Sequence, residues 1–344
     1  MSKRERVTDA PELLRVERLT KHFPVRRTKI IATRQHVHAV DEVTLAVRRG
    51  ETLGIVGESG CGKSTLGRCM IRLLDLTSGT VVFDGQDIST TPRQRLRALR
   101  REMQMVFQDP IASLNPRKTV GTIVSDPLRA HGVRDRQALR RRTAALLEMV
   151  GLSPEHERRY PHEFSGGQRQ RISVARALAL EPRLLIADEP VSALDVSVQA
   201  QVVNLLSDLQ DDLHLTYVFI AHDLAVVRHI SDRIAVMYLG KIVELGAADD
   251  VCGRPRHPYT EALLSAAPIP DLKISRTRSR IILHGDLPSA MAPPTGCRFH
   301  TRCPYATEIC RTDEPGLVAD AAGRQVACHH PVGGAPAFPT GATT

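Results

Sequence analysis

The chain has little of what several protein classes require. It has no tryptophan and only 3% aromatic residues, which argues against base stacking as a main mode of binding. No apolar run reaches the roughly 18 residues that a membrane-spanning helix needs. Residues 1–6 lead into no apolar segment, so we expect no signal peptide. These absences predict a cytosolic chain that meets a membrane only through partners.

The remaining composition is that of a soluble globular protein, with 42% hydrophobic and 25% charged residues in 344. The net charge of +9 is carried mostly by arginine, with clusters at residues 93–101 and 134–142. Solvated helix faces explain such clusters, and nucleic acid or an anionic membrane surface are the alternatives. Seven cysteines in a cytosolic chain argue against a disulfide framework.

Apolar segments alternate between strand and helix patterns, which predicts a mostly parallel, three-layered α/β core. Residues 24–38 and 109–165 interrupt the pattern, as a loop insertion and an inserted helical subdomain, and the chain becomes proline-rich after about residue 250. We expect strands at 12–23, 43–47, 52–56, 81–83, 103–107, 184–187 and 217–221. We expect helices at 62–74, 136–150, 166–180 and 196–213.

A glycine-rich segment between a predicted strand and a predicted helix matches the phosphate-loop pattern G-x-x-x-x-G-K-[ST]. Glycines let backbone N–H groups turn toward phosphates, and the positive end of the following helix points at the same place. Lys63 supplies charge for the β- and γ-phosphates, and the Ser64 hydroxyl suits Mg²⁺. The predicted nucleotide-binding residues here are Gly57, Glu58, Ser59, Gly60, Cys61, Gly62, Lys63, Ser64 and Thr65.

Two carboxylates, Asp188 and Glu189, follow the apolar strand 184–187. Open α/β sheets bind ligands at the carboxyl ends of their strands. Asp188 is therefore a candidate partner of Mg²⁺, and Glu189 is placed to polarise an attacking water. Without the phosphate loop, the pair could simply cap the next helix.

The segment Ser165-Gly166-Gly167-Gln168 opens a predicted helix, with Ser165 as its N-cap. Two glycines in a first turn cost roughly 1 kcal/mol each against alanine, so they suggest the close approach of an anion. An ordinary helix start is the alternative. A second anion site beside one phosphate loop would be redundant, which suggests that it serves another nucleotide.

The order of these motifs resembles the ATP-binding cassette (ABC) ATPases over about residues 12–270. By that resemblance Gln108 is the Q-loop glutamine, Phe164–Gln168 the signature (usually Leu first, here Phe), and Ser192–Asp195 the D-loop. His222 is the switch histidine. The adenine-stacking residue is Phe23, or His38 if the loop insertion places it there.

The resemblance implies a P-loop NTPase (RecA-like) ABC nucleotide-binding domain, residues 1–255, with a helical subdomain at about 109–165 and an irregular C-terminal extension, residues 256–344. It implies two cassettes paired head-to-tail around ATP. Catalysis falls to Glu189, His222 and Gln108, and Mg²⁺ to Ser64, Gln108 and Asp188. The contacts to the partner's ATP come from Ser165, Gly166, Gly167, Gln168 and Asp195.

Longer stretches resemble the oligopeptide/dipeptide importer ATPases, namely 106–110, 112–116, 159–163, 195–201 and 257–260. That branch implies a second ATPase subunit, copy or paralogue, two integral-membrane permease subunits and an extracytoplasmic peptide-binding protein. The chain would sit peripherally on the cytoplasmic face of the membrane. Nickel and glutathione importers are close alternatives. A nucleic-acid-associated ABC ATPase is the alternative from another class, and we expect no nucleic acid as partner.

Four cysteines lie near the C-terminus with the spacing Cys297-x5-Cys303-x6-Cys310-x17-Cys328. Four thiols can hold zinc or an iron–sulfur cluster, and the lack of a C-x-x-C spacing disfavours a zinc ribbon. The pattern resembles the tail of peptide-importer ATPases, some of which carry a [4Fe–4S] cluster. We expect that cluster, with zinc or free reduced thiols as alternatives. A sensor that uses ATP as a signal is a further hypothesis.

Overall fold

The computed structural model describes residues 10–25, 35–192, 194–266, 281–283, 285–321 and 323–333. The chain forms two compact units. The first comprises Met1–Leu13, Val47–Glu51 and Thr90–Ile220, and the second comprises Leu14–Ala46, Thr52–Ser89 and Ala221–Thr344. Each unit is described by itself.

The first unit contains three parallel strands, β6 (Met103–Val106), β7 (Leu184–Asp188) and β8 (Thr216–Ile220). β7 lies between the other two, with Leu184 level with Met103 on one side and with Thr216 on the other. Every residue of β7 and β8 is buried, as expected for strands covered on both faces. Of the two carboxylates of the sequence prediction, Asp188 is therefore the last residue of the middle strand and Glu189 follows it.

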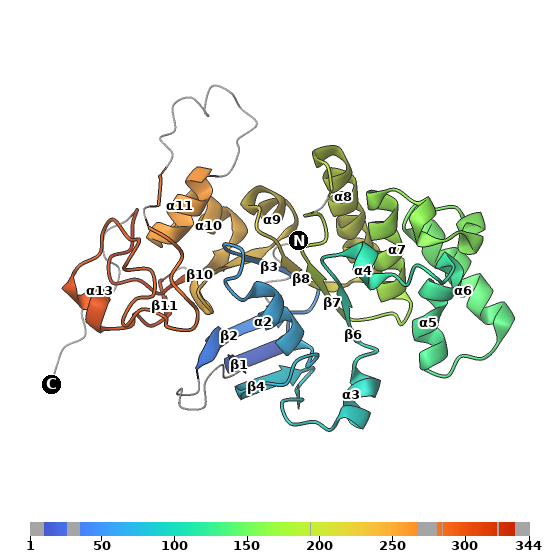
Figure 1. Cartoon of the computed structure of the whole chain (residues 1–344), viewed down its shortest axis with the longest axis horizontal. Coiled ribbons are helices and arrows are strands. Elements are labelled where there is room, and N and C mark those ends of the chain that lie inside the picture. Colours follow the sequence, from blue (N-terminus) through green and yellow to red (C-terminus); the bar gives the residue numbers. More distant parts are fainter. Residues whose placement is uncertain are drawn as a thin grey trace. The chain divides into compact units, whose positions relative to one another are not determined.

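Helices make up the rest of the first unit, and those between β6 and α7 form the inserted helical region (green in Figure 1). α5 packs against both α6 and α7. The elements are α3 (Arg93–Leu99), α4 (Pro110–Ser113), α5 (Val120–Ala130), α6 (Arg136–Met149), η1 (Pro154–Arg158), η2 (Pro161–Glu163), α7 (Gly166–Leu178) and α8 (Val196–Leu213). The predicted helical insertion is confirmed.

Helix α8 shows how the sequence sets these elements. Its buried residues recur every three or four positions at Val202, Leu206 and Leu209, which gives one apolar face. Asp195 caps its start, and His214 ends it in the left-handed conformation at φ 52°. The predicted bounds, 196–213, match those of the structure.

The second unit begins with an antiparallel sheet in the order β2-β1-β4-β5 (blue in Figure 1). Its strands are β1 (Glu12–Pro24), β2 (His36–Arg48), β4 (Ser78–Phe83) and β5 (Gln86–Asp87). β2 starts at His36, whereas the sequence suggested a loop as far as His38. The period-two burial along β2 begins only at Val43, so the first residues of the strand gave no strand signal.

A second sheet of this unit has the order β11-β12-β10-β9-β3. Its strands are β3 (Thr52–Val56), β9 (Arg233–Tyr238), β10 (Lys241–Ala247), β11 (Val318–Ala319) and β12 (Gln325–Val326). β3 and β9 run parallel, and the other neighbours are antiparallel. The sequence did not predict β9 and β10, and it treated the C-terminal extension as irregular, although two of its short segments join this sheet.

The helices of the second unit are short. They are α2 (Lys63–Met70), α9 (Leu224–Ile230), α10 (Ala248–Gly253), α11 (Pro258–Ala266) and α13 (Glu308–Thr312). α2 ends at Met70, four residues before the predicted end, and Arg72 follows in the left-handed conformation at φ 54°.

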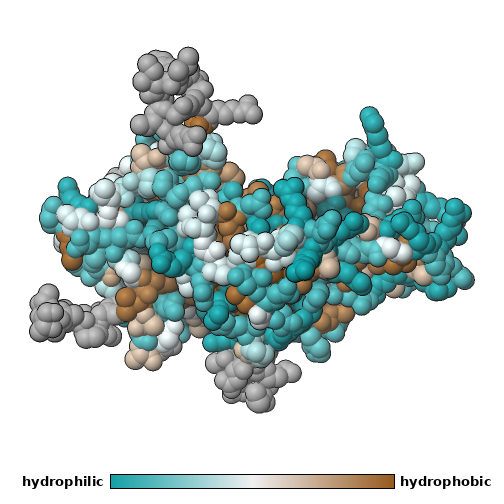
Figure 2. Space-filling model, turned by 90° about the horizontal axis from the view of Figure 1, so that it is seen from below, coloured by the Kyte–Doolittle hydropathy of each residue, from teal (hydrophilic) through white to brown (hydrophobic). Residues whose placement is uncertain are grey.

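The surface agrees with the soluble composition. Hydrophilic residues predominate on the face drawn in Figure 2, where hydrophobic residues form small separate groups among the residues that the structure describes. Within those same residues, no helix combines the length and the apolar character needed to cross a bilayer.

Candidate nucleotide-binding and hydrolysis site

The phosphate loop joins β3 to α2 in the second unit. Two of its glycines are required by close approach of other backbone. A Cβ on Gly57 would lie 2.1 Å from the carbonyl oxygen of Met237, and one on Gly62 would lie 1.9 Å from that of Ala39. Gly62 also has a φ of +107°, which glycine adopts without strain. The loop is therefore pressed against two strands, β2 and β9, and a side chain at either glycine would displace it.

Lys63 is the first residue of α2, and its side chain is almost fully buried in the loop. Its ammonium donates to the carbonyl oxygens of Gly57, at 2.8 Å, and Glu58, at 3.0 Å. α2 has no acidic residue in its first turn, so its positive end is not neutralised. Loop, ammonium and helix end together offer N–H donors and positive charge to an anion, and the binding of phosphates by Gly57 to Ser64 stays a prediction.

Residues from the C-terminal part of the chain hold this loop in place. The backbone N–H of Glu58 donates to the Tyr259 hydroxyl, and Arg302 donates to the Glu58 carboxylate, both at 2.8 Å. Burial raises the pKa of Tyr259, so its hydroxyl keeps its proton. Phe299 packs against Tyr259, with ring centroids 5.4 Å apart, and against Tyr238, at 5.3 Å. The loop is thus fixed by a hydrogen bond, an ion pair and an aromatic cluster.

A buried polar network holds Tyr259 in turn. The Glu244 carboxylate accepts backbone N–H groups of Arg256 and His257, each at 2.9 Å. The Nδ1 of His257 accepts the N–H of Tyr259 at 3.0 Å. Burial lowers the pKa of His257 to about 3, so the ring is neutral and can accept. In the sequence, residues 257–260 contributed only to the resemblance to peptide-importer ATPases. The structure shows that they also support the phosphate loop, through the hydrogen bond between Tyr259 and Glu58.

The two candidates for adenine stacking differ in surroundings. Phe23 is half-buried near the end of β1, and the Lys21 ammonium lies 4.8 Å from its ring centroid. His38 is also half-buried, but its ring packs on that of His22 with the centroids 4.0 Å apart, and its backbone N–H donates to the carbonyl oxygen of Ala290 at 2.8 Å. His38 thus has close partners within the protein, and Phe23 as the stacking residue stays a prediction.

The predicted hydrolytic residues lie in the first unit. Asp188 ends β7 and is fully buried. Glu189 follows with φ 45°, a left-handed conformation that few non-glycine residues adopt and that costs about 1–3 kcal/mol. Its N–H donates to Ile220 at 2.9 Å, and its carboxylate accepts from the Gln108 amide at 3.0 Å. The structure therefore brings Gln108 and Glu189 together, and their catalytic roles stay predictions.

The signature segment starts α7 as the sequence predicted. The Ser165 hydroxyl accepts the N–H of Gln168 at 3.3 Å, and the Gln168 side chain accepts the N–H of Ser165 at 3.0 Å. This capping box gives both side chains a structural role. A Cβ on Gly167 would lie 2.3 Å from Val198 Cγ1, so Gly167 allows α7 to pack on α8. Of the two signature glycines, Gly166 is the exposed one, and neither its φ nor a close backbone contact requires a glycine there.

Asp195 and His222 both stand next to helix starts. The Asp195 carboxylate accepts from the Ser197 hydroxyl at 2.6 Å and the Val198 N–H at 2.9 Å, and these bonds lower its pKa. His222, in the second unit, is exposed and directly precedes Asp223, the N-cap of α9. The contacts of either residue to ATP stay predictions.

A hydrogen bond joins the segment after Gln108 to the signature helix. Arg176, in α7, donates to the carbonyl oxygen of Ser113, in α4, at 2.5 Å. The hydroxyl groups of Ser113 and Ser173 lie 3.4 Å apart. Burial lowers the pKa of Arg176. A displacement of α4 would therefore also displace α7, the helix that carries the signature. No sequence pattern predicted this contact.

The four cysteines of the extension are not arranged for zinc. One tetrahedral zinc ion with bonds of about 2.3 Å holds its sulfurs about 3.8 Å apart. Among the described residues, the one group of three or more His, Cys, Asp or Glu ligand atoms within 4.8 Å of one another is His22, His38 and Asp41. Burial raises the pKa of Cys297 to about 11 and that of Cys328 to about 12. Neither the structure nor the comparisons below support the predicted [4Fe–4S] cluster.

Comparisons with known proteins agree with the motifs. Residues 40–192 match the ABC transporter family, and residues 243–310 match the oligopeptide/dipeptide transporter C-terminal region. The chain is 54% identical to the oligopeptide transport ATP-binding protein AppF of Bacillus subtilis, over 92% of this chain and 97% of that protein. It is 54% identical to OppF of Salmonella typhimurium, over 89% and 92%. A dimeric ATP-binding cassette, MJ0796, solved with ADP and Pi, is 28% identical with a TM-score of 0.60, covering 68% of this chain and 98% of that one.

Proposed function

The chain belongs to the ABC transporter family of ATPases, and from this membership we propose that it is the ATP-hydrolysing subunit of an importer of di- and oligopeptides. The observation that carries the proposal is the phosphate loop, whose Glu58 is held by two residues of the region that matches the oligopeptide/dipeptide transporter family. The named relatives are oligopeptide transport ATP-binding proteins, and the similarity covers almost their whole length. This favours peptides over nickel or glutathione as the substrate.

The chemistry follows from the residues of each unit. In the second unit, Lys63 and the loop N–H groups bind the phosphates, while Ser64 takes part in binding Mg²⁺ and Phe23 stacks on adenine. In the first unit, Asp188 and Gln108 serve Mg²⁺, and Glu189 polarises the attacking water. The Gln108 amide orients the Glu189 carboxylate before the reaction. His222 contacts the γ-phosphate.

The signature requires a second cassette. Gly166 is exposed at the first position of α7, where free backbone N–H groups and the helix end favour an anion. The cassette MJ0796 forms a dimer with ADP and Pi, and we infer a corresponding pair here, with a copy or a paralogue. Ser165, Gly166, Gly167, Gln168 and Asp195 then face the partner's nucleotide.

The remaining partners follow from the importer. Two integral-membrane permease subunits would anchor the chain peripherally at the cytoplasmic face, and a binding protein on the other side would deliver peptide. The contact between Arg176 and Ser113 gives a route from the segment after Gln108 to the signature helix. A nucleic-acid-associated ATPase is not favoured by any comparison.

An iron–sulfur cluster on the four cysteines is a finer part of the proposal. Backbone N–H groups donate to three of the sulfurs. Cys297 accepts from Phe299 and His300, Cys303 accepts from Tyr305, and Cys328 accepts from His330. Such bonds stabilise thiolates and suit sulfurs that ligate iron. Iron and acid-labile sulfide in the protein purified without oxygen would support it, and their absence would leave reduced thiols.

The test of the main proposal is transport. The chain is expressed with candidate permease subunits and a second ATPase, and the assembly is purified from membranes and placed in vesicles. Labelled tripeptide uptake that requires ATP, and that is lost when Lys63→Ala replaces the wild type, is expected. A purified assembly that hydrolyses ATP but takes up nickel or glutathione in preference to peptide would overturn the substrate assignment.

A further inference from the structure

Two histidines and an aspartate converge at the ends of β1 and β2. His22 belongs to β1, and His38 and Asp41 belong to β2. His22 Nε2 lies 3.5 Å from Asp41 Oδ1, and His38 Nδ1 lies 3.5 Å from Asp41 Oδ2. We propose that these three side chains bind one divalent transition-metal ion, such as zinc.

The spacing of the three side chains fits one ion. Tetrahedral nitrogen and oxygen ligands with bonds of about 2.0–2.1 Å lie about 3.3 Å from one another. The two measured separations are 3.5 Å, close to that edge length, and they end on the two different oxygens of Asp41. One ligand atom from each of the three residues lies within 4.8 Å of the other two. Both ring nitrogens, His22 Nε2 and His38 Nδ1, are inaccessible to solvent, and among the described residues each has only the distant Asp41 carboxylate as a polar partner. A buried nitrogen with so poor a partner is costly, and a metal ion would remove that cost for both.

The surroundings supply what a metal site needs beyond its ligands. Arg298 donates to Asp41 Oδ2, which orients the carboxylate and leaves Oδ1 toward His22. Neutral imidazole is the form of histidine that binds a metal ion.

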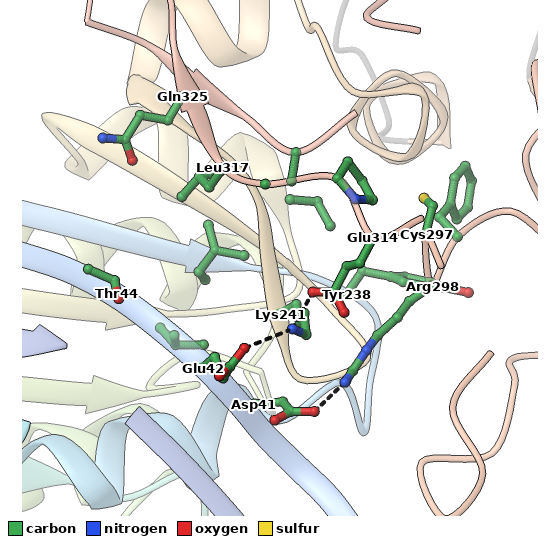
Figure 3. A pocket seen from close by; sticks show the side chains of 17 residues that line it. Asp41, Glu42, Thr44, Tyr238, Lys241, Cys297, Arg298, Glu314, Leu317 and Gln325 are labelled. Atoms are coloured by element: carbon green, nitrogen blue, oxygen red, sulfur yellow. Dashed lines mark hydrogen bonds and ion pairs between the residues drawn. The ribbon is translucent and has the colours of Figure 1, made fainter. Parts of the chain in front are cut away.

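An ion can reach the site. The side chains of the three residues are between 17% and 30% exposed. Asp41 also lines a cavity of about 390 Å³, where Figure 3 shows it beside Arg298. Three other charged residues that line this cavity form ion pairs, in which Lys241 contacts both Glu42 and Glu314. Histidine-rich ligand sets suit zinc, copper(II) or nickel(II) rather than Mg²⁺ or Ca²⁺.

The location gives the ion a consequence. His22 directly precedes Phe23 in the chain. A metal bound by His22 and His38 would link the end of β1 to the start of β2. Three protein ligands leave one position of a tetrahedral ion open for water or another ligand atom. Occupancy would therefore fix the backbone that carries Phe23.

The experiment uses the full chain, freed of metal with a chelator and titrated with cobalt(II) alone and zinc alone. Cobalt on nitrogen and oxygen ligands gives visible bands without the strong near-ultraviolet charge-transfer band of thiolate ligands, so the site is distinguished from the cysteines. We expect one such cobalt equivalent, and a rise in Tm on adding zinc.

Three variants decide the assignment. His22→Gln and His38→Gln should each weaken the nitrogen/oxygen cobalt signal at least tenfold and remove that part of the zinc-dependent rise in Tm. His229→Gln, at an exposed histidine of α9, is the matched control and should bind as the wild type does. Circular dichroism checks that each variant is folded. Unchanged binding in both folded variants, or cobalt that binds only with thiolate bands, would overturn the proposal.

Discussion

The backbone N–H of Glu58 donates a 2.8 Å hydrogen bond to the hydroxyl of Tyr259, a residue 201 positions further along the chain. The donor belongs to the phosphate loop, and the acceptor belongs to the region matched by the oligopeptide/dipeptide transporter family. A feature of the importer branch therefore takes part in shaping the phosphate site common to the whole family.

Tyr259→Phe tests this contact. The change leaves the Glu58 N–H without its acceptor at a part-buried place, which should cost about 1–3 kcal/mol in free energy of unfolding and lower the affinity for ATP. Urea unfolding and binding of a fluorescent ATP analogue measure the two effects. Tyr305→Phe removes a hydroxyl from an exposed ring and serves as the control. Wild-type stability and affinity in Tyr259→Phe would show that the hydrogen bond is dispensable.

Gly167→Ala should destabilise the first unit. Its new Cβ would lie 2.3 Å from Val198 Cγ1, and overpacking of this kind costs about 1–3 kcal/mol. The second change Val198→Ala removes the clashing methyl and should restore much of the loss. Urea unfolding of the two single variants and the double variant measures the coupling. Purely additive effects would mean that the glycine is there for another reason, such as a ligand.

Gly166→Arg separates the two glycines. A Cβ there lies 3.2 Å from Leu194 Cδ2, a contact that a small shift of this side chain relieves, so folding should be little affected. If Gly166 faces the partner's nucleotide, the isolated chain should bind ATP normally while hydrolysis by the assembled pair falls at least a hundredfold. Comparable loss of ATP binding by the isolated chain would contradict an action across the pair.

Glu189→Gln should keep ATP binding and abolish turnover. The amide cannot accept a proton from water, and loss of general-base catalysis typically costs 10²–10⁴-fold. With ATP and Mg²⁺ the variant should accumulate as a pair, visible by size-exclusion chromatography with light scattering. Glu181→Gln changes an exposed carboxylate and should behave as the wild type. Sustained phosphate release by Glu189→Gln would remove Glu189 from its assigned role.

Acidification should weaken the fold through His257. Its pKa lies near 3 when folded and near 6.5 when unfolded, so between these values only the unfolded chain takes up the proton. Stability from this group is therefore present above pH 6.5 and is lost as the pH falls, by about 1.4 kcal/mol between pH 7.5 and 5.5.

The variant His257→Asn isolates this contribution, because the amide oxygen can still accept the Tyr259 N–H but does not titrate. The difference in free energy of unfolding between wild type and variant should change by that amount over the same pH interval. A difference that stays constant with pH would show that His257 titrates normally in the folded chain.

Much of the first unit could be predicted from the sequence. Buried parallel strands such as β7 are continuous apolar runs, and helices such as α8 carry both an apolar period and a cap. The contacts that hold the phosphate loop could not be foreseen, since they join Glu58 to Tyr259 and Arg302, and no local pattern records such distant pairs. Strand β9 was missed because a buried apolar run can belong to either a helix or a strand, and β10 was missed because Glu244 interrupts its apolar run.

The signature shows a different limit. Ser165 was predicted as the N-cap from its residue type, and the structure confirms this. Both glycines were attributed to an approaching anion, whereas Gly167 is explained by the packing of α7 on α8. Sequence indicates that a side chain must be absent, but only the fold tells whether protein or ligand takes its place.

The dependence of Glu58 on Tyr259 and Arg302 bears on modularity. A shortened protein that stops at residue 255 would retain every sequence motif of an ATPase while losing both side chains that hold the phosphate loop. Such a fragment would be a poor surrogate for the enzyme, and a chimera that exchanges C-terminal regions between related cassettes would inherit its nucleotide affinity partly from the donor of the tail.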